Sequence, residues 1–281
     1  MRQKLSRDKI ICVSTAFLLL ALLAAATLRD RSDRLERSRV QIVALGDSIF
    51  GLVQDETSIP AQVGALTGMT VFNGAFGGTC ISRIDGERRL DYVKDSLSLV
   101  GLAKAVAADD FGVQQTLKSR ESNTQYYMET VDELERVDFS SVELVLIMHG
   151  LNDYYSGVPI HNEKDSYDEY TFIGALRSSI EFLHQANPGM RIVLVTPTYT
   201  WYLASGETCE EYNVGRGVQE DYINAEMELA QELGIEVIDV YHDVYPHEKW
   251  EDWELYTVDG FHPNQSGREL LADIIAEYLG V

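Results

Sequence analysis

Three side chains with complementary chemistry stand at two distant points of the sequence. Ser48 follows the apolar run 42–45 directly, within Gly46-Asp47-Ser48, while Asp259 and His262 stand three residues apart near the other end of the chain. A serine hydroxyl is a weak nucleophile near neutral pH until a base takes its proton, and a carboxylate commonly holds a histidine base in one tautomer. The residue types therefore predict Ser48 as nucleophile, His262 as base and Asp259 as the acid that orients it.

Acyl transfer also needs hydrogen-bond donors for the negative oxygen that forms during attack, and losing one donor typically costs roughly 10²–10³ in rate. Gly78 ends the glycine-rich segment 73–78, where the backbone can approach a substrate closely. Asn152 lies in the polar group 149–153. We expect the N–H of Ser48, the N–H of Gly78 and the side-chain amide of Asn152 to form the oxyanion hole. Gly77 is adjacent, and Gly78 is the residue that we choose.

Alternating strand-like and helix-like segments separate these groups. Apolar runs predict five strands, at 40–45, 70–73, 142–148, 190–195 and 235–240. Apolar residues at helical spacing predict helices at 57–66, 91–108, 124–137, 167–186, 217–233 and 264–279. This alternation predicts a parallel sheet covered by helices on both faces, with 2-1-3-4-5 as the simplest strand order. The polar groups should then meet at the carboxyl edge of the sheet, where ligands bind in open α/β folds.

Each residue also has an ordinary structural interpretation. Ser48 could cap a helix, and Asn152-Asp153 could form a turn. The pair Asp239 and His242 has the same spacing as Asp259 and His262, but it ends a predicted strand directly, and we favour His262 as the base. We expect Asp47 and Asp153 to accept backbone hydrogen bonds around the site rather than to transfer protons.

Metal and cofactor chemistry receive no support from the sequence. His242, His247 and Glu248 lie close together, but the spacing H-E-x-x-H is absent and neither Cys80 nor Cys209 has a nearby cysteine partner. We therefore expect a reaction without metal or cofactor. His149 follows a predicted strand, and it could either line the pocket or make a structural hydrogen bond.

Composition bounds the fold and the partners. The chain has 281 residues, of which 45% are hydrophobic, enough for the core of one α/β domain over residues 40–281. That domain holds 14 basic and 41 acidic residues. A surface with this charge repels phosphate backbones, so a nucleic-acid partner is not expected.

Residues 1–39 form a separate N-terminal segment and linker. Residues 10–28 are uncharged and mostly apolar, and four basic residues precede them. A run of this length can just span a bilayer, which predicts a single membrane anchor. The small residues Ala24–Ala26 also fit a cleaved signal peptide. Five Arg residues follow the run within residues 29–39, so the positive-inside rule does not decide the orientation of an anchor. We favour the domain at the extracellular face of the membrane or in the medium, because an export signal needs only a basic start and an apolar run. Outside the cell Cys80 and Cys209 could form a disulfide, or both could stay as buried thiols.

Aromatic residues are concentrated after the third and fourth predicted strands, at Tyr154, Tyr155, Tyr199, Trp201 and Tyr202. Aromatic rings at the rim of a pocket can stack on sugar rings. The same residues can instead pack a lid, such as residues 154–170, onto the core.

The four polar groups together resemble the sequence blocks of the GDSL-type SGNH hydrolases. The resemblance spans residues 40–280, through Gly46-Asp47-Ser48, Gly78, Gly150-Leu151-Asn152-Asp153 and Asp259-Gly260-Phe261-His262. One departure is Ile49, where the family motif has leucine. The resemblance implies a flavodoxin-like three-layer α/β/α sandwich around a five-stranded parallel sheet. It also implies hydrolysis of esters or thioesters without a metal.

Three functions follow as hypotheses. The first is a serine ester hydrolase that forms an acyl-enzyme and removes short acyl groups, such as acetyl, from an extracellular polysaccharide or other carbohydrate. The second is a cell-envelope O-acyltransferase, in which a sugar hydroxyl replaces water. The third is a carbohydrate-binding module without catalysis, which predicts that Ser48→Ala leaves function intact.

Overall fold

The computed structural model describes residues 40–86, 93–116 and 127–280. The predicted anchor or signal run, residues 10–28, lies outside these ranges. Among the residues that the structure describes, no helix is both long and apolar enough to cross a membrane.

Five parallel strands form the central sheet in the order β2-β1-β3-β4-β7, which confirms the predicted order. β1 and β3 pair over five residues, from Ile42 opposite Leu144 to Gly46 opposite Met148, and every residue of both strands is buried. Strands covered on both faces read as continuous apolar runs, which explains why these two were visible in the sequence. The strands are β1 (Ile42–Gly46), β2 (Val71–Asn73), β3 (Leu144–Met148), β4 (Arg191–Val195) and β7 (Glu236–Ile238).

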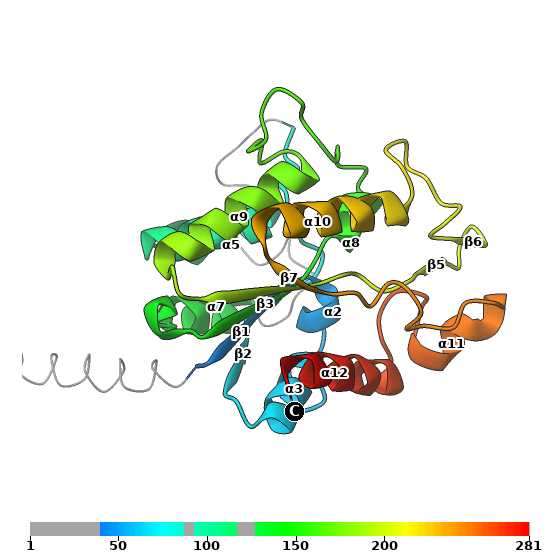
Figure 1. Ribbon diagram of the computed structural model, residues 1–281, viewed down its shortest axis with the longest axis horizontal. Coiled ribbons are helices and arrows are strands. Elements are labelled where there is room, and N and C mark those ends of the chain that lie inside the picture. The colour runs from blue at the N-terminus through cyan, green and yellow to red at the C-terminus, as the bar shows by residue number, and fades with distance from the viewer. Residues whose placement is uncertain (1–39, 87–92, 117–126, 281) are drawn as a thin grey trace, which may run out of the picture. The chain divides into compact units, whose positions relative to one another are not determined.

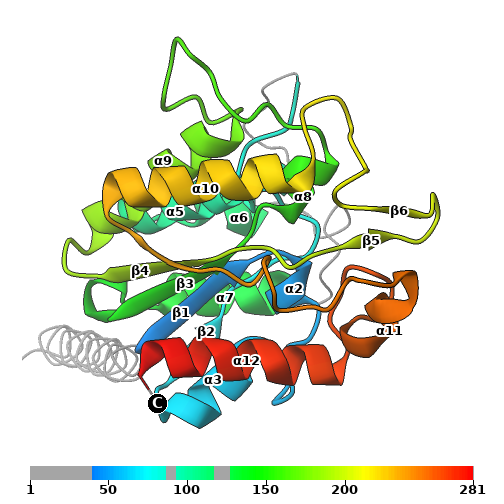
Figure 2. The same ribbon diagram turned by 45° about the vertical axis from the view of Figure 1, so that its right-hand side comes forward.

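Helices cover both faces of the sheet, as Figures 1 and 2 show. α3 (Ile59–Thr67) and α12 (Gln265–Leu279) pack together on one face. The longer helices of the opposite face are α5 (Leu99–Ala108), α9 (Phe172–Ala186) and α10 (Gln219–Leu233). The result is the predicted three-layer α/β/α arrangement.

Local hydrogen bonds fix where the main helices begin. Ser58 accepts the N–H of Ala61 at the start of α3, and Asn264 accepts the N–H of Gly267 at the start of α12. Such N-caps satisfy backbone donors that have no partner within the helix. The cap on Asn264 sets the start of α12 three residues after His262, so it also fixes the end of the loop that carries the predicted base.

Two predicted helices have the wrong extent. The helix predicted at 91–108 is divided into α4 (Val93–Ser96) and α5, because Ser98 donates to Asp95 O and caps α5 by accepting the N–H of Gly101. The helix predicted at 167–186 begins at Phe172, because Thr171 caps it. In both cases a hydroxyl side chain accepts a backbone N–H at this point, so the helix does not extend further towards the N-terminus.

Several short elements were not predicted, and they include an antiparallel hairpin of β5 (Trp201–Tyr202) and β6 (Glu207–Thr208). α2 (Ser48–Gly51), α8 (Leu151–Tyr155), α11 (Trp253–Tyr256) and this hairpin all lie at the carboxyl end of the sheet (Figure 2). The remaining elements are α6 (Gly112–Thr116), α7 (Tyr127–Arg136) and the 3₁₀ helices η2 (Phe139–Ser141) and η3 (Trp250–Asp252).

Candidate active site

Ser48 is the first residue of α2, directly beyond the end of β1. The helix is capped by Asp47, whose side chain accepts the N–H of Ile49 at 3.0 Å, so the hydroxyl of Ser48 has no capping role. That hydroxyl instead lies 2.9 Å from Nε2 of His262. The distance is short enough for direct proton transfer between the two side chains.

Asp259 holds His262 through several hydrogen bonds. Its Oδ2 lies 2.8 Å from Nδ1 of His262, and its Oδ1 accepts the backbone N–H of His262 at 2.8 Å and of Phe261 at 3.1 Å. Partial burial opposes ionisation of this carboxyl, but the hydrogen bonds from His262 outweigh it and lower the pKa of Asp259. A carboxylate on Nδ1 keeps Nε2 directed at Ser48, so the structure brings the three predicted residues together.

Gly260 is necessary for the turn that joins Asp259 to His262. Its φ is +87°, and a β-carbon at this position would overlap the carbonyl oxygen of Trp201. The N–H of Trp201 donates to Gly260 O at 3.0 Å. The unpredicted hairpin therefore packs directly on the turn and supports the position of the base.

Asn152 links two of the predicted oxyanion segments. Its Nδ2 donates to Thr79 O at 2.9 Å, next to Gly78, and to Oδ2 of Asp47 at 3.3 Å, next to Ser48. Both amide hydrogens thus have protein acceptors in this structure. The bond to Asp47 is the longer and therefore the weaker of the two.

The two backbone donors of the predicted oxyanion hole lie in the segments that Asn152 joins. Gly78 adopts a φ of +74°, in the left-handed region that glycine favours. Ser48 is at the first position of α2, where a backbone N–H has no partner within the helix. Neither N–H donates to another described residue. Both N–H groups therefore lack a protein acceptor among the described residues, which is compatible with the predicted oxyanion hole.

Two buried carboxyls accept backbone hydrogen bonds around the site, as predicted. Burial raises the pKa of Asp47 to about 7, against the lowering effects of the Ile49 N–H and of His262. Burial likewise raises the pKa of Asp153 to about 6, although Ile81 and Ser82 donate three hydrogen bonds to it. These bonds join α8 to the segment after Gly78. The sequence did not identify Thr79, whose carbonyl positions Asn152, because no side-chain chemistry marks it.

His149 makes structural hydrogen bonds. It is almost fully buried, and burial lowers its pKa to about 3, so its ring is neutral. Nδ1 accepts the N–H of Gly150, which leaves the proton on Nε2, 3.3 Å from the hydroxyl of Thr79. This ring fixes the start of α8 and with it the position of Asn152.

The rival pair Asp239 and His242 has the same internal geometry as Asp259 and His262. Nδ1 of His242 lies 2.7 Å from Oδ2 of Asp239, but Nε2 faces Oε1 of Glu220 at 3.9 Å rather than a serine hydroxyl. Spacing alone therefore did not separate the two pairs, whereas the neighbour of Nε2 does. Among the described residues, no group of three His, Cys, Asp or Glu side chains is arranged to hold a metal ion.

Cys80 and Cys209 are both buried and are not joined by a disulfide. Sγ of Cys209 lies 3.6 Å from the hydroxyl of Tyr241, and burial raises the pKa of this thiol to about 11. Such a thiol is protonated near neutral pH and is a poor nucleophile.

The aromatic residues differ in exposure. Tyr154, Tyr199, Trp201 and Tyr202 are buried, whereas Tyr155 is 52% exposed. Packing therefore accounts for four of the five. Tyr155 adjoins two rings that the sequence did not mark, Tyr212 and Phe261.

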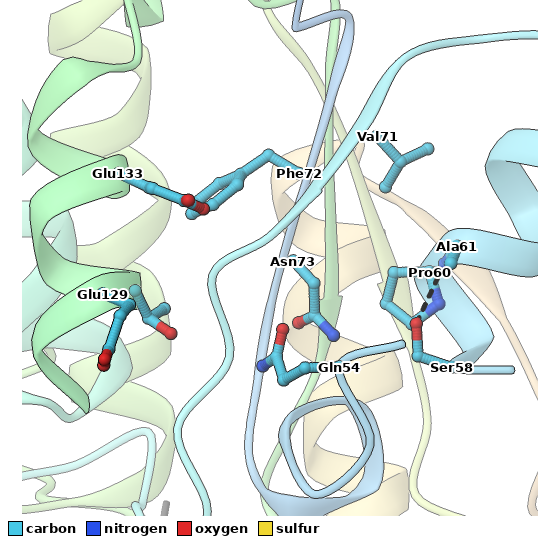
Figure 3. A pocket seen from close by; sticks show the side chains of 10 residues that line it. Gln54, Ser58, Pro60, Ala61, Val71, Phe72, Asn73, Glu129 and Glu133 are labelled. Carbon is cyan, nitrogen blue, oxygen red and sulfur yellow. Dashed lines mark hydrogen bonds between the residues drawn. The ribbon is translucent and has the colours of Figure 1, made fainter. Parts of the chain in front are cut away.

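A pocket of about 340 Å³ lies elsewhere, at the β2 edge of the sheet (Figure 3). Glu129 and Glu133 of α7 line one side, and Pro60 and Ala61 of α3 the other. None of the predicted catalytic or oxyanion residues lines it. This pocket is therefore separate from the predicted catalytic residues.

The fold is an open parallel α/β sheet, and serine, histidine and aspartate are hydrogen-bonded in series at its carboxyl edge. This is the class of α/β proteins with a site of the acyl-transfer type. The particular family follows from sequence. The chain belongs to the GDSL-like lipase/acylhydrolase family, whose model matches residues 44–270. Family membership supports a general hydrolase activity.

Solved structures share the fold at low sequence identity. A crystal structure of a Lactobacillus plantarum protein is 18% identical with a TM-score of 0.60, covering 85% of this chain and 96% of that one. Est24, a carbohydrate acetylesterase from Sinorhizobium meliloti, is 14% identical with a TM-score of 0.50 and coverages of 85% and 98%. The salicylyl-acyltransferase SsfX3, from a tetracycline biosynthetic pathway, is 15% identical with a TM-score of 0.52 and coverages of 86% and 55%. No curated protein matches the chain significantly.

Proposed function

We propose that this protein is a serine ester hydrolase that removes short acyl groups, acetyl in particular, from an extracellular carbohydrate through an acyl-enzyme. The observation that carries the proposal is the continuous hydrogen-bonded series from Ser48 through His262 to Asp259. This series supports Ser48 as the nucleophile, His262 as the base and Asp259 as the orienting acid.

In the first half of the reaction, Nε2 of His262 takes the proton from Ser48 Oγ as that oxygen attacks the acyl carbon. Asp259 stabilises the imidazolium that forms. The N–H groups of Ser48 and Gly78 and the amide of Asn152 hold the oxyanion. When the tetrahedral intermediate collapses, His262 gives its proton to the leaving alcohol oxygen, and the acyl group stays on Ser48.

In the second half, water takes the place of the alcohol. His262 removes a proton from this water, which attacks the acyl carbon in turn, and Ser48 leaves with the proton that His262 returns. The same three residues serve both halves, so one site suffices for the full cycle.

Two observations support a short acyl group on a carbohydrate. Est24, which shares the fold, is described as a carbohydrate acetylesterase. The strongly acidic domain also disfavours negatively charged substrates such as phospholipids.

We extend the proposal to location, because residues 10–28 have the length of an anchor. Fractionation of cells tests this part: recovery of the whole chain, with its N-terminus intact, in the cytosol would refute it.

The direct test of the function is turnover of p-nitrophenyl esters of increasing acyl length, together with acetylated xylan. We expect the acetate to have the highest kcat/KM, and Ser48→Ala to lose at least about 10³-fold of this activity. Absence of ester turnover by the wild type would refute hydrolase function. A preference for long acyl chains would refute the assignment of a short acyl group.

Transfer to a sugar hydroxyl is the second candidate function, because SsfX3, which shares the fold, is described as an acyltransferase. Transfer differs from hydrolysis only in the acceptor that resolves the acyl-enzyme. The ratio of free acetate to acetylated acceptor, measured with an excess of xylo-oligosaccharide, separates the two: dominance of free acetate supports the hydrolase.

A further inference from the structure

One aromatic ring near the catalytic residues is exposed, while its neighbours are buried or partly buried. Tyr155 is the last residue of α8, the helix that also carries Asn152, and it is 52% exposed. The rings of Tyr155, Tyr202, Tyr212 and Phe261 form what we call the aromatic cluster. Its members come from four separate segments at the carboxyl end of the sheet (Figure 2).

The cluster fixes the orientation of the exposed ring. Tyr155 is parallel to Tyr202 and Tyr212, at 5° and 12°, with ring centres 6.0 and 6.2 Å away. Tyr202 and Tyr212 stack on each other at 3.8 Å. Behind them, the buried Tyr154 donates a hydrogen bond to Tyr212 O at 2.6 Å and anchors that segment. A ring held in this way loses little conformational entropy when a ligand stacks on it.

The cluster also lies on the histidine side of the site. Phe261 precedes His262 directly. Its ring makes edge-to-face contacts with the rings of Tyr155 and Tyr202, with ring centres 6.3 and 5.0 Å apart. His262 returns its proton to the oxygen of the leaving alcohol. The alcohol part of the substrate must therefore lie next to His262, and Phe261 joins this residue to the exposed ring of Tyr155.

The charge of the surrounding segments restricts what that alcohol can be. Residues 199–216 and 247–259, which include the hairpin and α11, hold eight acidic and two basic residues. A neutral ring is compatible with this field, whereas a uronic acid or a phosphate is repelled. An exposed aromatic face suits the apolar face of a pyranose, which stacks without needing charge.

We propose that Tyr155 is a specificity-determining residue that binds the alcohol part of the ester, a neutral sugar ring, by stacking beside His262. This inference rests on the proposed ester hydrolase function and adds the chemistry of the leaving group. Tyr155 binds substrate and takes no part in proton transfer, so its loss should act on KM more than on kcat.

The test compares two acetyl esters that differ only in the alcohol: an acetylated xylo-oligosaccharide and glyceryl triacetate, which has no ring. In Tyr155→Ala, we expect KM for the sugar ester to rise about three- to tenfold more than KM for glyceryl triacetate, the range that an aromatic contact supplies. Tyr155→Trp keeps an aromatic face and should restore most of the difference.

Tyr278→Ala is the matched control. Tyr278 is also exposed, at 42%, but it contacts Glu236 at the opposite end of the sheet, and its substitution should change neither KM. Equal effects of Tyr155→Ala on both substrates would show a structural role and overturn the proposal. Turnover of glyceryl triacetate without turnover of the sugar ester by the wild type would overturn it as well, with hydrolase function intact. Loss of both activities in the wild type would overturn the proposed function itself.

Discussion

At the scale of single residues, the chain contains two aspartate–histidine pairs with nearly the same geometry. Each has a carboxylate oxygen within 2.8 Å of Nδ1, and each histidine is partly exposed. They differ in what faces Nε2, which is Ser48 for His262 and Glu220 for His242. The catalytic assignment therefore depends on the partner of one nitrogen, and the second pair offers an internal control.

Asp259→Asn should lower kcat by roughly 10²–10⁴-fold, because an amide at this position no longer stabilises the imidazolium and favours the wrong tautomer. Asp239→Asn makes the same chemical change at the pair without a serine and should leave kcat near the wild-type value. Initial rates on p-nitrophenyl acetate measure both. Equal losses in the two variants would contradict the assignment of His262 as the base.

Asp47 predicts how stability depends on pH. Burial raises its pKa from the ordinary 3.8 to about 7, so between these values the folded chain keeps a proton that the unfolded chain has lost. Stability therefore falls as pH rises through this window, by an amount on the order of a few kcal/mol in total. Asp47→Asn cannot ionise, and its free energy of unfolding should improve relative to the wild type from about pH 4 to about pH 7.

Asp55 provides a control of opposite sign. The hydroxyl of Thr57 lowers the pKa of this exposed carboxyl, so its stabilising effect is present above its ordinary pKa and is lost as pH falls. The free energy of unfolding of Asp55→Asn should therefore fall relative to that of the wild type as pH rises. Urea unfolding at several pH values measures both slopes, and parallel slopes for Asp47→Asn and the wild type would contradict the buried, protonated carboxyl.

At the scale of elements, the turn between Asp259 and His262 depends on the hairpin that packs against it. Gly260→Ala introduces a methyl group against Trp201 O at a positive φ, and we expect it to cost about 1–3 kcal/mol and to lower kcat by displacing the base. Gly68→Ala has a similar positive φ with open space around it. It should cost about 1 kcal/mol and leave kcat unchanged. Thermal unfolding and rates separate the two; unchanged kcat in Gly260→Ala would contradict the role of the turn.

The sequence predicted the elements that one strong local pattern determines. β1 and β3 are buried on both faces and appear as apolar runs, and the parallel order follows from the alternation of strands and helices. The predicted start of α9 was wrong, because the N-cap at Thr171 begins the helix later than its apolar spacing indicated. The hairpin could not be predicted, since its strands have two residues each and are held by contacts with Gly260 and neighbouring rings.

The site was predictable to the same degree. Ser48, Asp259 and His262 were recognisable because their residue types and spacing carry chemistry in themselves. Thr79 acts through a backbone carbonyl, and Tyr212 and Phe261 matter through rings that meet only in the folded chain. Neither the role of a backbone carbonyl nor a contact between distant rings leaves a pattern in a linear sequence. The engagement of both Asn152 hydrogens was likewise visible only in the structure.

At the scale of the whole molecule, the sheet gathers loops from distant parts of the chain at one edge. Ser48 and His262 are 214 residues apart in sequence, yet one hydrogen bond joins them. The acidic charge of the domain that carries this edge disfavours anionic ligands. The two proposed functions, hydrolysis and transfer, both require the same covalent intermediate on Ser48.

The most direct test is therefore to trap that intermediate. Mixing the protein with p-nitrophenyl acetate, quenching in acid within the first turnover and measuring intact and peptide masses should reveal one added acetyl group, located on Ser48. Ser48→Ala should acquire none. An acetyl group found on another residue, or wild-type rates of turnover in Ser48→Ala, would contradict the account.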